Sequence, residues 1–210
     1  TGVYSRRLQA FLEDYGYDYV ILNPLKAKKE MDMGLRHNKT DKTDAYHLAL
    51  IQRLYHHPIN QLQSQTYKQL NSLSRFYDQL TADLVMAKNR LHQALQSTFP
   101  EIENLFSAAK GKNYWQIIVR YPHCDLVRRE DKKQLINWLM SLKGIAFKHA
   151  LRTADKLIEL AYQAYPVVSC SSIEVEQVQY YAHRLLNLSE QRKQLIARMV
   201  KLAKTLPNHD

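Results

Sequence analysis

The sequence of 210 residues has few of the residues that shape turns between strands. It contains 5 glycines and 6 prolines, whereas average glycine usage of about 7% would give roughly fifteen glycines in a chain of this length. Hairpins and sandwiches need both residues at their turns, so this shortage argues against an all-β fold. Long helices are the expected alternative.

Cysteine and long apolar runs are also scarce. Cys124 and Cys170, the two cysteines, lie far apart, and neither belongs to a Cys-x-x-Cys pair, so we expect neither a disulfide scaffold nor a zinc site. No apolar run approaches the roughly 20 residues that cross a bilayer. The opening residues, TGVYSRRLQ, lack the apolar segment of a signal peptide. We therefore expect a reduced, cytoplasmic protein that makes no membrane contact.

Positive charge is what the sequence has in excess. Lys and Arg number 30 against 20 Asp and Glu, a formal net charge of +10, which favours a polyanionic partner such as nucleic acid. Residues 110–156 hold eleven basic and four acidic residues, so +7 of this charge lies there. The same segment contains aromatic residues that suit base stacking but also have the spacing of a helical core: Tyr114, Trp115, Tyr121, Trp138 and Phe147.

Residues 1–58 have the pattern of one end of an α/β domain. Residues 5–15 have helical apolar spacing and end at Gly16, a natural helix stop. A short basic helix over residues 25–33 and an apolar helix over residues 41–55 follow. This region is the first predicted domain.

The segment of residues 17–22, YDYVIL, has the β-branched and aromatic composition of a buried strand. A single strand needs neighbours for its backbone N–H and C=O groups. We therefore expect the rest of the sheet to lie before Thr1.

Residues 61–206 form the second predicted domain, in which two segments have apolar residues in alternating steps of three and four. The first series is Leu70, Leu73, Tyr77, Leu80, Leu84, Ala87, Leu91 and Ala94; the second is Val178, Tyr181, Leu185, Leu188, Arg192, Leu195, Met199 and Leu202. Such helices predict an antiparallel coiled coil or a pairing across a dimer, with an ordinary helical bundle as the alternative. The predicted fold class is mainly α, with an α/β remnant followed by a helical domain.

Asp41 and Asp44, in the stretch KTDKTDA, carry the most informative chemistry. Because they are three residues apart on a helix, their carboxylates lie side by side and suit Mg²⁺, which takes its other ligands from phosphate and water. Such a pair fits a two-metal phosphodiester site. The structural alternative is that Asp41 is the helix N-cap and that Asp44 favours the helix dipole.

The order of short motifs over residues 1–55 resembles a known family. TGVY, a strand followed by Asn23 and Pro24, a basic helix, Arg36, and KTDKTDA running into an apolar helix are similar to the RuvC-like (RNase H-like) domain of DEDD transposases. These belong to the insertion-sequence family numbered one hundred and ten, whose members are guided by a bridge RNA. The long helices resemble the coiled-coil segment of that family.

The resemblance implies that Asp41 and Asp44 are the last two carboxylates of an Asp-Glu-Asp-Asp set that binds Mg²⁺. The first two would lie before Thr1, and a domain with a nucleophilic serine would follow the chain. The expected function is therefore that of a DNA transposase that cuts and joins strands, of which this chain is an inactive fragment. Its expected partners are DNA, a guide RNA and a second copy bound through the coiled coil.

The candidate nucleic-acid contacts are basic residues beside the aspartates and in the basic segment: Arg36, Lys39, Lys42, Arg128, Arg129, Lys132 and Lys133. The alternative function is a non-catalytic helical module for nucleic-acid binding and dimerisation. A third is a purely structural coiled-coil protein.

Overall fold

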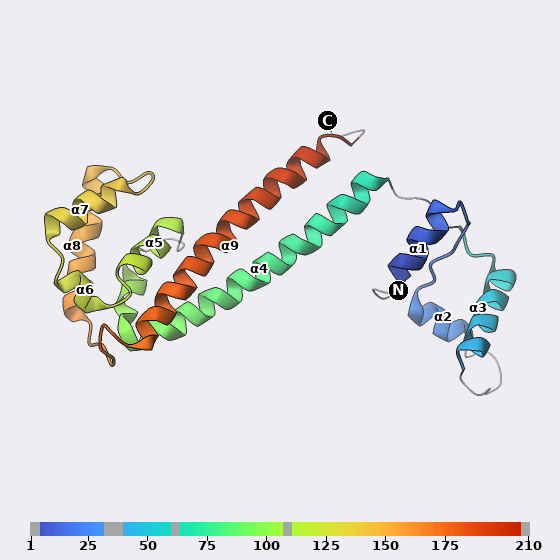
Figure 1. Ribbon diagram of the computed structural model, residues 1–210, viewed down its shortest axis with the longest axis horizontal. Helices are drawn as coiled ribbons and strands as arrows, with labels where there is room; N and C mark the ends of the chain where they lie inside the picture. The colour runs from blue at the N-terminus through green and yellow to red at the C-terminus, as the bar shows by residue number, and fades with distance from the viewer. Residues whose placement is uncertain (1–4, 32–39, 60–63, 107–110, 207–210) are drawn as a thin grey trace. The chain divides into compact units, whose positions relative to one another are not determined.

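The structure is a computed structural model that describes residues 5–31, 40–59, 64–106 and 111–206 (Figure 1). It divides into two compact units, Thr1–Gln65 and Thr66–Asp210. The described residues form helices joined by short connections and contain no strand. The prediction of a mainly α protein is confirmed. Within the described part of the chain, no helix is both long and apolar enough to cross a membrane.

Three helices make up the described part of the first unit: α1 (Ser5–Asp14), α2 (Pro24–Met31) and α3 (Asp41–Tyr55). Each lies where the sequence pattern predicts a helix. α2 begins at Pro24, whose fixed φ suits the first helical turn. α1 ends as predicted at Gly16, which has a φ of 70°, and the Tyr17 N–H closes the turn by donating to the Leu12 carbonyl at 2.8 Å.

The predicted strand is wrong. Residues 17–22 connect α1 to α2 and form neither a helix nor a strand. A strand exists through hydrogen bonds to a neighbouring strand, and no other described segment of the chain offers one.

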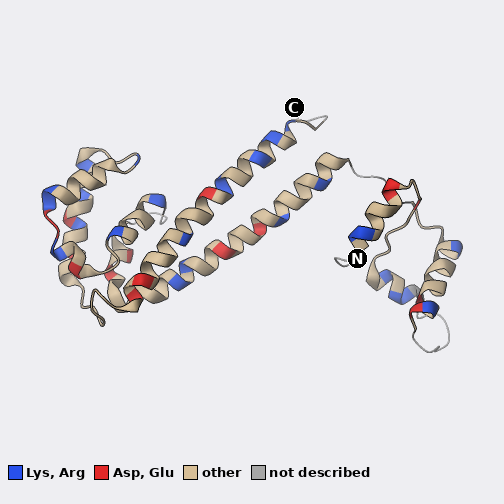
Figure 2. Ribbon diagram, in the orientation of Figure 1, with Lys and Arg blue, Asp and Glu red and all other residues tan. Residues whose placement is uncertain are grey.

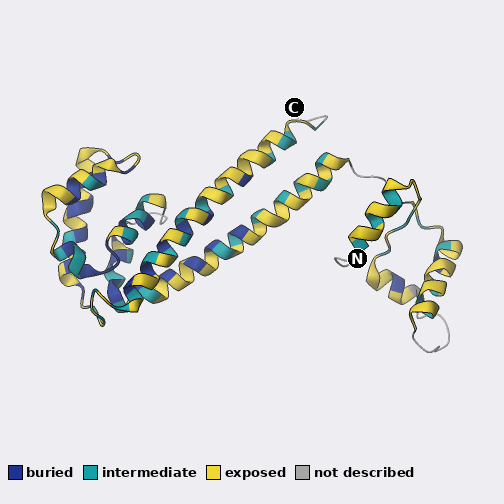
Figure 3. Ribbon diagram, in the orientation of Figure 1, coloured by how far each residue is buried: buried dark blue, intermediate teal, exposed yellow. Residues whose placement is uncertain are grey.

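The first unit buries few side chains (Figure 3). Among its described residues, the buried apolar ones are Ala27 and Ile51. Large apolar side chains are exposed on all three helices and on their connections: Leu8, Phe11, Tyr15, Tyr17, Ile21, Leu25, Tyr46, Leu48, Leu50, Leu54, Tyr55 and Ile59. Domains that are stable on their own rarely expose so much apolar surface, so this unit is suited to packing against further polypeptide.

Two long helices of the second unit, α4 (Gln65–Thr98) and α9 (Ile173–Ala203), lie side by side and run in opposite directions (Figure 1). Arg184 Nη2 lies 3.7 Å from Asp83 Oδ2, and Arg192 lies over the Tyr77 ring, which together define the antiparallel register. All sixteen residues of the two predicted series are buried or half-buried. The two series thus share one seam within the chain, while the supercoiling of a coiled coil stays a prediction.

The chain between the long helices forms five shorter elements: η1 (Pro100–Asn104), α5 (Lys112–Arg120), α6 (Cys124–Arg128), α7 (Lys132–Ser141) and α8 (Phe147–Gln163). α5 packs on α9, and α6, α7 and η1 pack on α8. Their buried side chains join those of α4 and α9 in one core (Figure 3).

The aromatic residues of the basic segment belong mainly to this core. Tyr114, Trp115 and Tyr121 are buried, and Trp138 is half-buried against the same cluster. The helical-core interpretation of these residues is therefore correct, and base stacking by the three buried rings is excluded. Phe147, at the start of α8, is exposed.

Candidate functional site

The N-terminus of α3 is built by two threonines. The Thr40 hydroxyl accepts the Thr43 backbone N–H at 3.2 Å, and the Thr43 hydroxyl accepts the Thr40 N–H at 3.0 Å. This reciprocal capping box satisfies backbone donors that a helix start leaves without intrahelical partners. Asp44 N–H begins the helical ladder by donating to the Thr40 carbonyl at 2.9 Å.

Asp41 and Asp44 both lie in the first turn of α3, and their side chains are not needed to form it. Thr40, and not Asp41, is the N-cap, so the N-cap alternative for Asp41 is wrong. Asp41 is exposed and Asp44 is half-buried. Their carboxylates take part in none of the hydrogen bonds or ion pairs among the described residues. The two side chains therefore remain available to a ligand from solvent.

The chemistry of this turn suits a divalent cation that also binds phosphate. Two carboxylates three residues apart offer the oxygen ligands that Mg²⁺ prefers. The N-terminal end of a helix carries partial positive charge and attracts phosphate. Lys42 is exposed between the two aspartates in sequence and adds a positive charge to the same turn. Arg36 and Lys39 lie outside the described residues.

The first unit also contains an open apolar groove of about 750 Å³. It lies between α1, residues 18–22, α2 and α3, and its apolar lining includes Leu8, Leu12, Val20, Leu22, Leu48 and Ile59. Neither Asp41 nor Asp44 is among the described residues that line it. The groove is thus distinct from the two aspartates.

Arg128, a predicted nucleic-acid contact, is bound within the second unit. Its Nη1 donates to Asp125 Oδ1 at 2.7 Å, its Nε to the Ala161 carbonyl at 2.8 Å and its Nη2 to the Ala164 carbonyl at 2.6 Å. Burial raises the pKa of Asp125, but the Arg128 hydrogen bond and nearby charges outweigh it and hold that pKa below its usual value. Arg128 therefore joins α6 to the C-terminal end of α8.

Three further predicted contacts, Arg129, Lys132 and Lys133, are exposed at the end of α6 and the start of α7. Figure 2 shows Lys and Arg positions along this part of the chain. Lys132 forms an exposed ion pair with Asp155 on α8. Such exposed pairs contribute little to stability, so Lys132 can exchange Asp155 for a phosphate at small cost. Arg129, Lys132 and Lys133 form the first part of a basic surface.

α8 extends this basic surface with a stripe that the site predictions did not include. Lys148, Arg152 and Lys156 are four residues apart, are all exposed and lie on one face of the helix. The i, i+4 spacing of these basic residues was the available signal. Because the helix rises about 6 Å over four residues, the three cations form a row that suits a phosphate backbone.

Comparison with models of known protein families matches residues 1–100 to the IS110-type DEDD transposases, a family described as transposase. The matched part contains α1 to α4 and therefore both aspartates. No curated protein and no solved structure matches the chain.

Proposed function

We propose, from the premise that residues 1–100 belong to the IS110-type DEDD transposases, that Asp41 and Asp44 bind Mg²⁺ in a site that cuts and joins DNA strands. The observation that carries this proposal is the capping of α3 by Thr40 and Thr43. Because the threonines build the helix start, two adjacent carboxylates are left with no structural partner among the described residues. A pair of this kind suits metal binding.

Each group at the start of α3 has a separate role in this proposal. Asp41 and Asp44 hold the ion, and the backbone N–H groups of the turn and Lys42 attract the DNA phosphate to the same place. Mg²⁺ bound there supplies stabilisation of the charge on the reacting phosphate oxygens. The capping box orients both carboxylates by holding the turn in helical geometry.

We further propose that the apolar groove of the first unit is covered by the remaining strands of a RuvC-like sheet. The support is the exposed apolar surface of α1, α2 and α3 together with the strand-like composition of residues 17–22. A sheet covering the groove would bury this surface and give residues 17–22 the partners that a strand requires. The chain alone is then catalytically inactive, and activity belongs to the complete transposase.

Recombination of a donor and a target DNA by the complete transposase tests the metal site. Asp44→Asn and Asp41→Asn should each abolish recombination because each removes a carboxylate ligand while keeping the shape of the side chain. Asp14→Asn, at the exposed end of α1, is the matched control and should recombine normally. Normal recombination by Asp44→Asn would overturn the proposal.

A second test uses this chain alone and needs no activity. Mn²⁺ is a paramagnetic substitute for Mg²⁺ and should broaden the NMR signals of residues 40–45 selectively. The variant with both Asp41→Asn and Asp44→Asn should lose this broadening, whereas Asp14→Asn should keep it. Uniform broadening across the chain in all variants would contradict a specific site.

The exposed basic surface favours a second function, nucleic-acid binding by the helical unit, either within the transposase or as a non-catalytic module. We propose DNA and a guide RNA as its partners, with Arg129, Lys133 and the α8 stripe as the contacts. Replacing Lys148, Arg152 and Lys156 by Glu should weaken RNA or DNA binding. It should also reduce the slope of log K against log salt concentration by about 2–3, since each of three phosphate contacts contributes about 0.7–0.9.

Three exposed basic residues of α9 provide the matched control for the stripe. Replacing Lys193, Arg198 and Lys201 by Glu changes the net charge equally and should leave most of the affinity intact. Equal losses in both triple variants would indicate a response to net charge and would contradict a defined contact surface. Binding that requires Asp41 and Mg²⁺ would contradict the non-catalytic alternative.

Self-association would have to use a surface other than the seam between α4 and α9. The seam is occupied within the chain, but the outer faces of the two helices expose Phe76, Val85, Met86, Ile196 and Val200. We propose that a second copy binds there. Sedimentation analysis should show a dimer that Val85→Lys with Met86→Lys dissociates, and a monomeric wild-type chain would overturn the proposal.

A further inference from the structure

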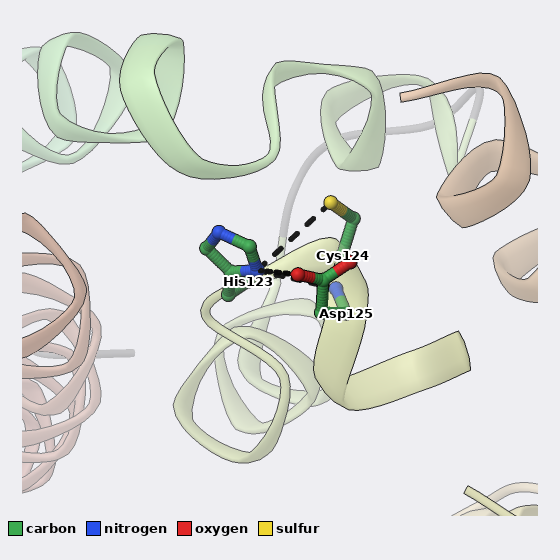
Figure 4. A group of neighbouring side chains, drawn as sticks. All are labelled: His123, Cys124 and Asp125. Atoms are coloured by element: carbon green, nitrogen blue, oxygen red, sulfur yellow. Dashed lines mark hydrogen bonds and ion pairs between the residues drawn. The ribbon is translucent and has the colours of Figure 1, made fainter. Parts of the chain in front are cut away.

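Four side chains from two distant stretches converge where the connection between α8 and α9 meets the start of α6. Cys170 Sγ, from that connection, lies 3.2 Å from His123 Nδ1 and 3.6 Å from Asp125 Oδ2. His123 Nδ1 lies 3.9 Å from Cys124 Sγ and 3.7 Å from Asp125 Oδ2 (Figure 4). His123 Nδ1 thus has both cysteine sulfurs and one carboxylate oxygen of Asp125 around it.

We propose that this cluster is a structural Zn²⁺ site with Cys124, Cys170, His123 and Asp125 as its ligands. Zinc accepts all three ligand types in tetrahedral geometry. Bond lengths of about 2.0–2.3 Å place the ligand atoms of such a tetrahedron about 3.3–3.8 Å apart. Four of the six ligand-to-ligand distances, 3.2, 3.6, 3.7 and 3.9 Å, agree with this spacing to within a few tenths of an ångström. The ligand atoms of His123, Cys124 and Asp125 all lie within 4.8 Å of one another, and Cys170 joins this group through its contacts with His123 and Asp125.

The hydrogen bonds of His123 orient its ring for a metal. Nε2 lies 2.9 Å from the Val168 carbonyl, which can only accept, so Nε2 carries the hydrogen and donates it. Nδ1 is therefore unprotonated, and its lone pair accepts the Asp125 backbone N–H at 3.2 Å while both sulfurs lie nearby. A histidine that binds zinc through one nitrogen usually donates from the other to a carbonyl or carboxylate. Zinc would replace the bond from the Asp125 amide with a stronger one.

Arg128 orients the carboxylate in the same way. Its Nη1 holds Asp125 Oδ1 at 2.7 Å, so Oδ2 is the oxygen that faces His123 and Cys170. Zinc with two thiolates and one carboxylate carries one net negative charge, and the adjacent Arg128 guanidinium balances it. Both the imidazole and the carboxylate are therefore oriented by hydrogen bonds to groups that do not bind the metal, as is usual for ligands in metal sites.

The burial of the four ligands suits a structural ion. His123 and Cys124 are fully buried, whereas Asp125 and Cys170 are half-buried. An ion can thus enter from the side of Cys170 and is shielded elsewhere. It would fasten the connection between α8 and α9 to α6. The absence of a Cys-x-x-Cys pair led to the expectation of no zinc site, but the fold brings Cys170 to the ligands at His123–Asp125 across more than forty residues.

Metal binding by the full chain tests the proposal. The protein is purified under reducing conditions, stripped with a chelator and titrated with Zn²⁺ or with Co²⁺ as an optical probe. We expect one Zn²⁺ per chain, a thiolate-to-cobalt charge-transfer band, and an increase in Tm when Zn²⁺ is added. Cys170→Ser and Cys124→Ser should each weaken Zn²⁺ binding by at least roughly 100-fold, more than the loss caused by changing an outer-shell group.

Ser171→Ala, in the same connection as Cys170, is the matched control and should bind Zn²⁺ as wild type does. Because Cys170 is half-buried, Cys170→Ser should fold with a metal-free Tm close to that of wild type, so lost binding in this variant reports a lost ligand. Zn²⁺ binding that is equal in wild type and Cys170→Ser would overturn the proposal. A chain that binds no Zn²⁺ when reduced and forms a Cys124–Cys170 disulfide when oxidised would overturn it as well.

Discussion

Arg192 of α9 lies over the ring of Tyr77 of α4, with its guanidinium carbon 5.9 Å from the ring centre. Arg192 is the polar exception in the second predicted series, and Tyr77 belongs to the first. The guanidinium lies over the ring, whose negative face attracts a cation. A charged residue is therefore accommodated at a position that would otherwise favour an apolar side chain.

A double-mutant cycle measures this contact. Arg192→Ala and Tyr77→Ala should each lower the free energy of unfolding, and the double variant should lose less than the two single losses combined. We expect a coupling free energy of about 0.5–1 kcal/mol from urea unfolding, the usual range for a cation over an exposed or half-buried ring. The control pair Arg198→Ala and Tyr77→Ala should be additive, and additivity in the Arg192 pair would show that the stacking does not contribute.

Removing the charge of Arg128 should lower the stability of the chain much more than removing the charge of the adjacent Arg129. Arg128→Gln breaks charge-assisted hydrogen bonds to Asp125 and to two α8 carbonyls, so it should lower the free energy of unfolding by at least about 2 kcal/mol. Arg129→Gln changes an exposed side chain and should alter stability by less than about 0.5 kcal/mol. Chemical denaturation followed by circular dichroism measures both.

Nucleic-acid affinity, in contrast to stability, should depend on Arg129. Arg129→Gln should weaken RNA or DNA binding while leaving the fold intact, because its side chain is exposed on the basic surface. Arg128→Lys keeps the charge but not the planar fork, so it should still destabilise the chain. Full stability of Arg128→Lys would mean that charge alone, and not the three directed hydrogen bonds, holds α6 to α8.

Local patterns in the sequence predicted most of the helices, and contacts between distant residues account for what was missed. The stop at Gly16 and the 3-4 spacing of α4 and α9 depend on neighbours within one or two turns, so the sequence reveals them. Residues 17–22 have strand composition, but strand formation depends on partners elsewhere. The role of Arg128 depends on main-chain carbonyls of α8, whose position no side-chain pattern encodes.

In the candidate sites, too, the features set by near neighbours were predictable and those set by distant residues were not. The pairing of Asp41 with Asp44 was predictable because three residues on a helix place two side chains together. The cap at Thr40 was missed because Asp, Thr and Ser have similar N-cap preferences and the sequence offers two adjacent choices. The approach of Cys170 to His123 requires the complete arrangement of α6, α8 and α9, which the sequence pattern does not supply.

The capping box at Thr40 should be necessary for the start of α3. Thr40→Ala removes the hydroxyl that accepts the Thr43 N–H, so it should destabilise the first turn by about 1 kcal/mol. Thr40→Ser keeps an accepting hydroxyl and should behave as wild type. Amide hydrogen exchange of residues 41–44 reports this turn directly. Equal protection in Thr40→Ala and Thr40→Ser would show that Asp41 has taken over the cap.

Tyr121 should make the stability of the second unit fall at alkaline pH. Burial raises the pKa of its hydroxyl to about 12, with Glu130 adding to the effect and Arg120 opposing it. The hydroxyl donates to Glu130 Oε2 at 3.2 Å and accepts from Arg120 Nε at 2.9 Å. In the unfolded chain the pKa of tyrosine is about 10. The folded state therefore keeps its proton at a pH where the unfolded state has lost it.

The sign of the pH dependence follows from that difference. Below pH ~10 the Tyr121 contribution is fully present, and between about pH 10 and about pH 12 ionisation favours the unfolded chain, lowering the free energy of unfolding by up to about 2 kcal/mol. Tyr121→Phe has no such group, so its stability should approach that of wild type as the pH rises through this window. Tyr165→Phe changes an exposed ring and should run parallel to wild type in urea unfolding at each pH. A stability difference between wild type and Tyr121→Phe that stays constant from neutral to alkaline pH would show that Tyr121 ionises as readily in the folded chain as in the unfolded one.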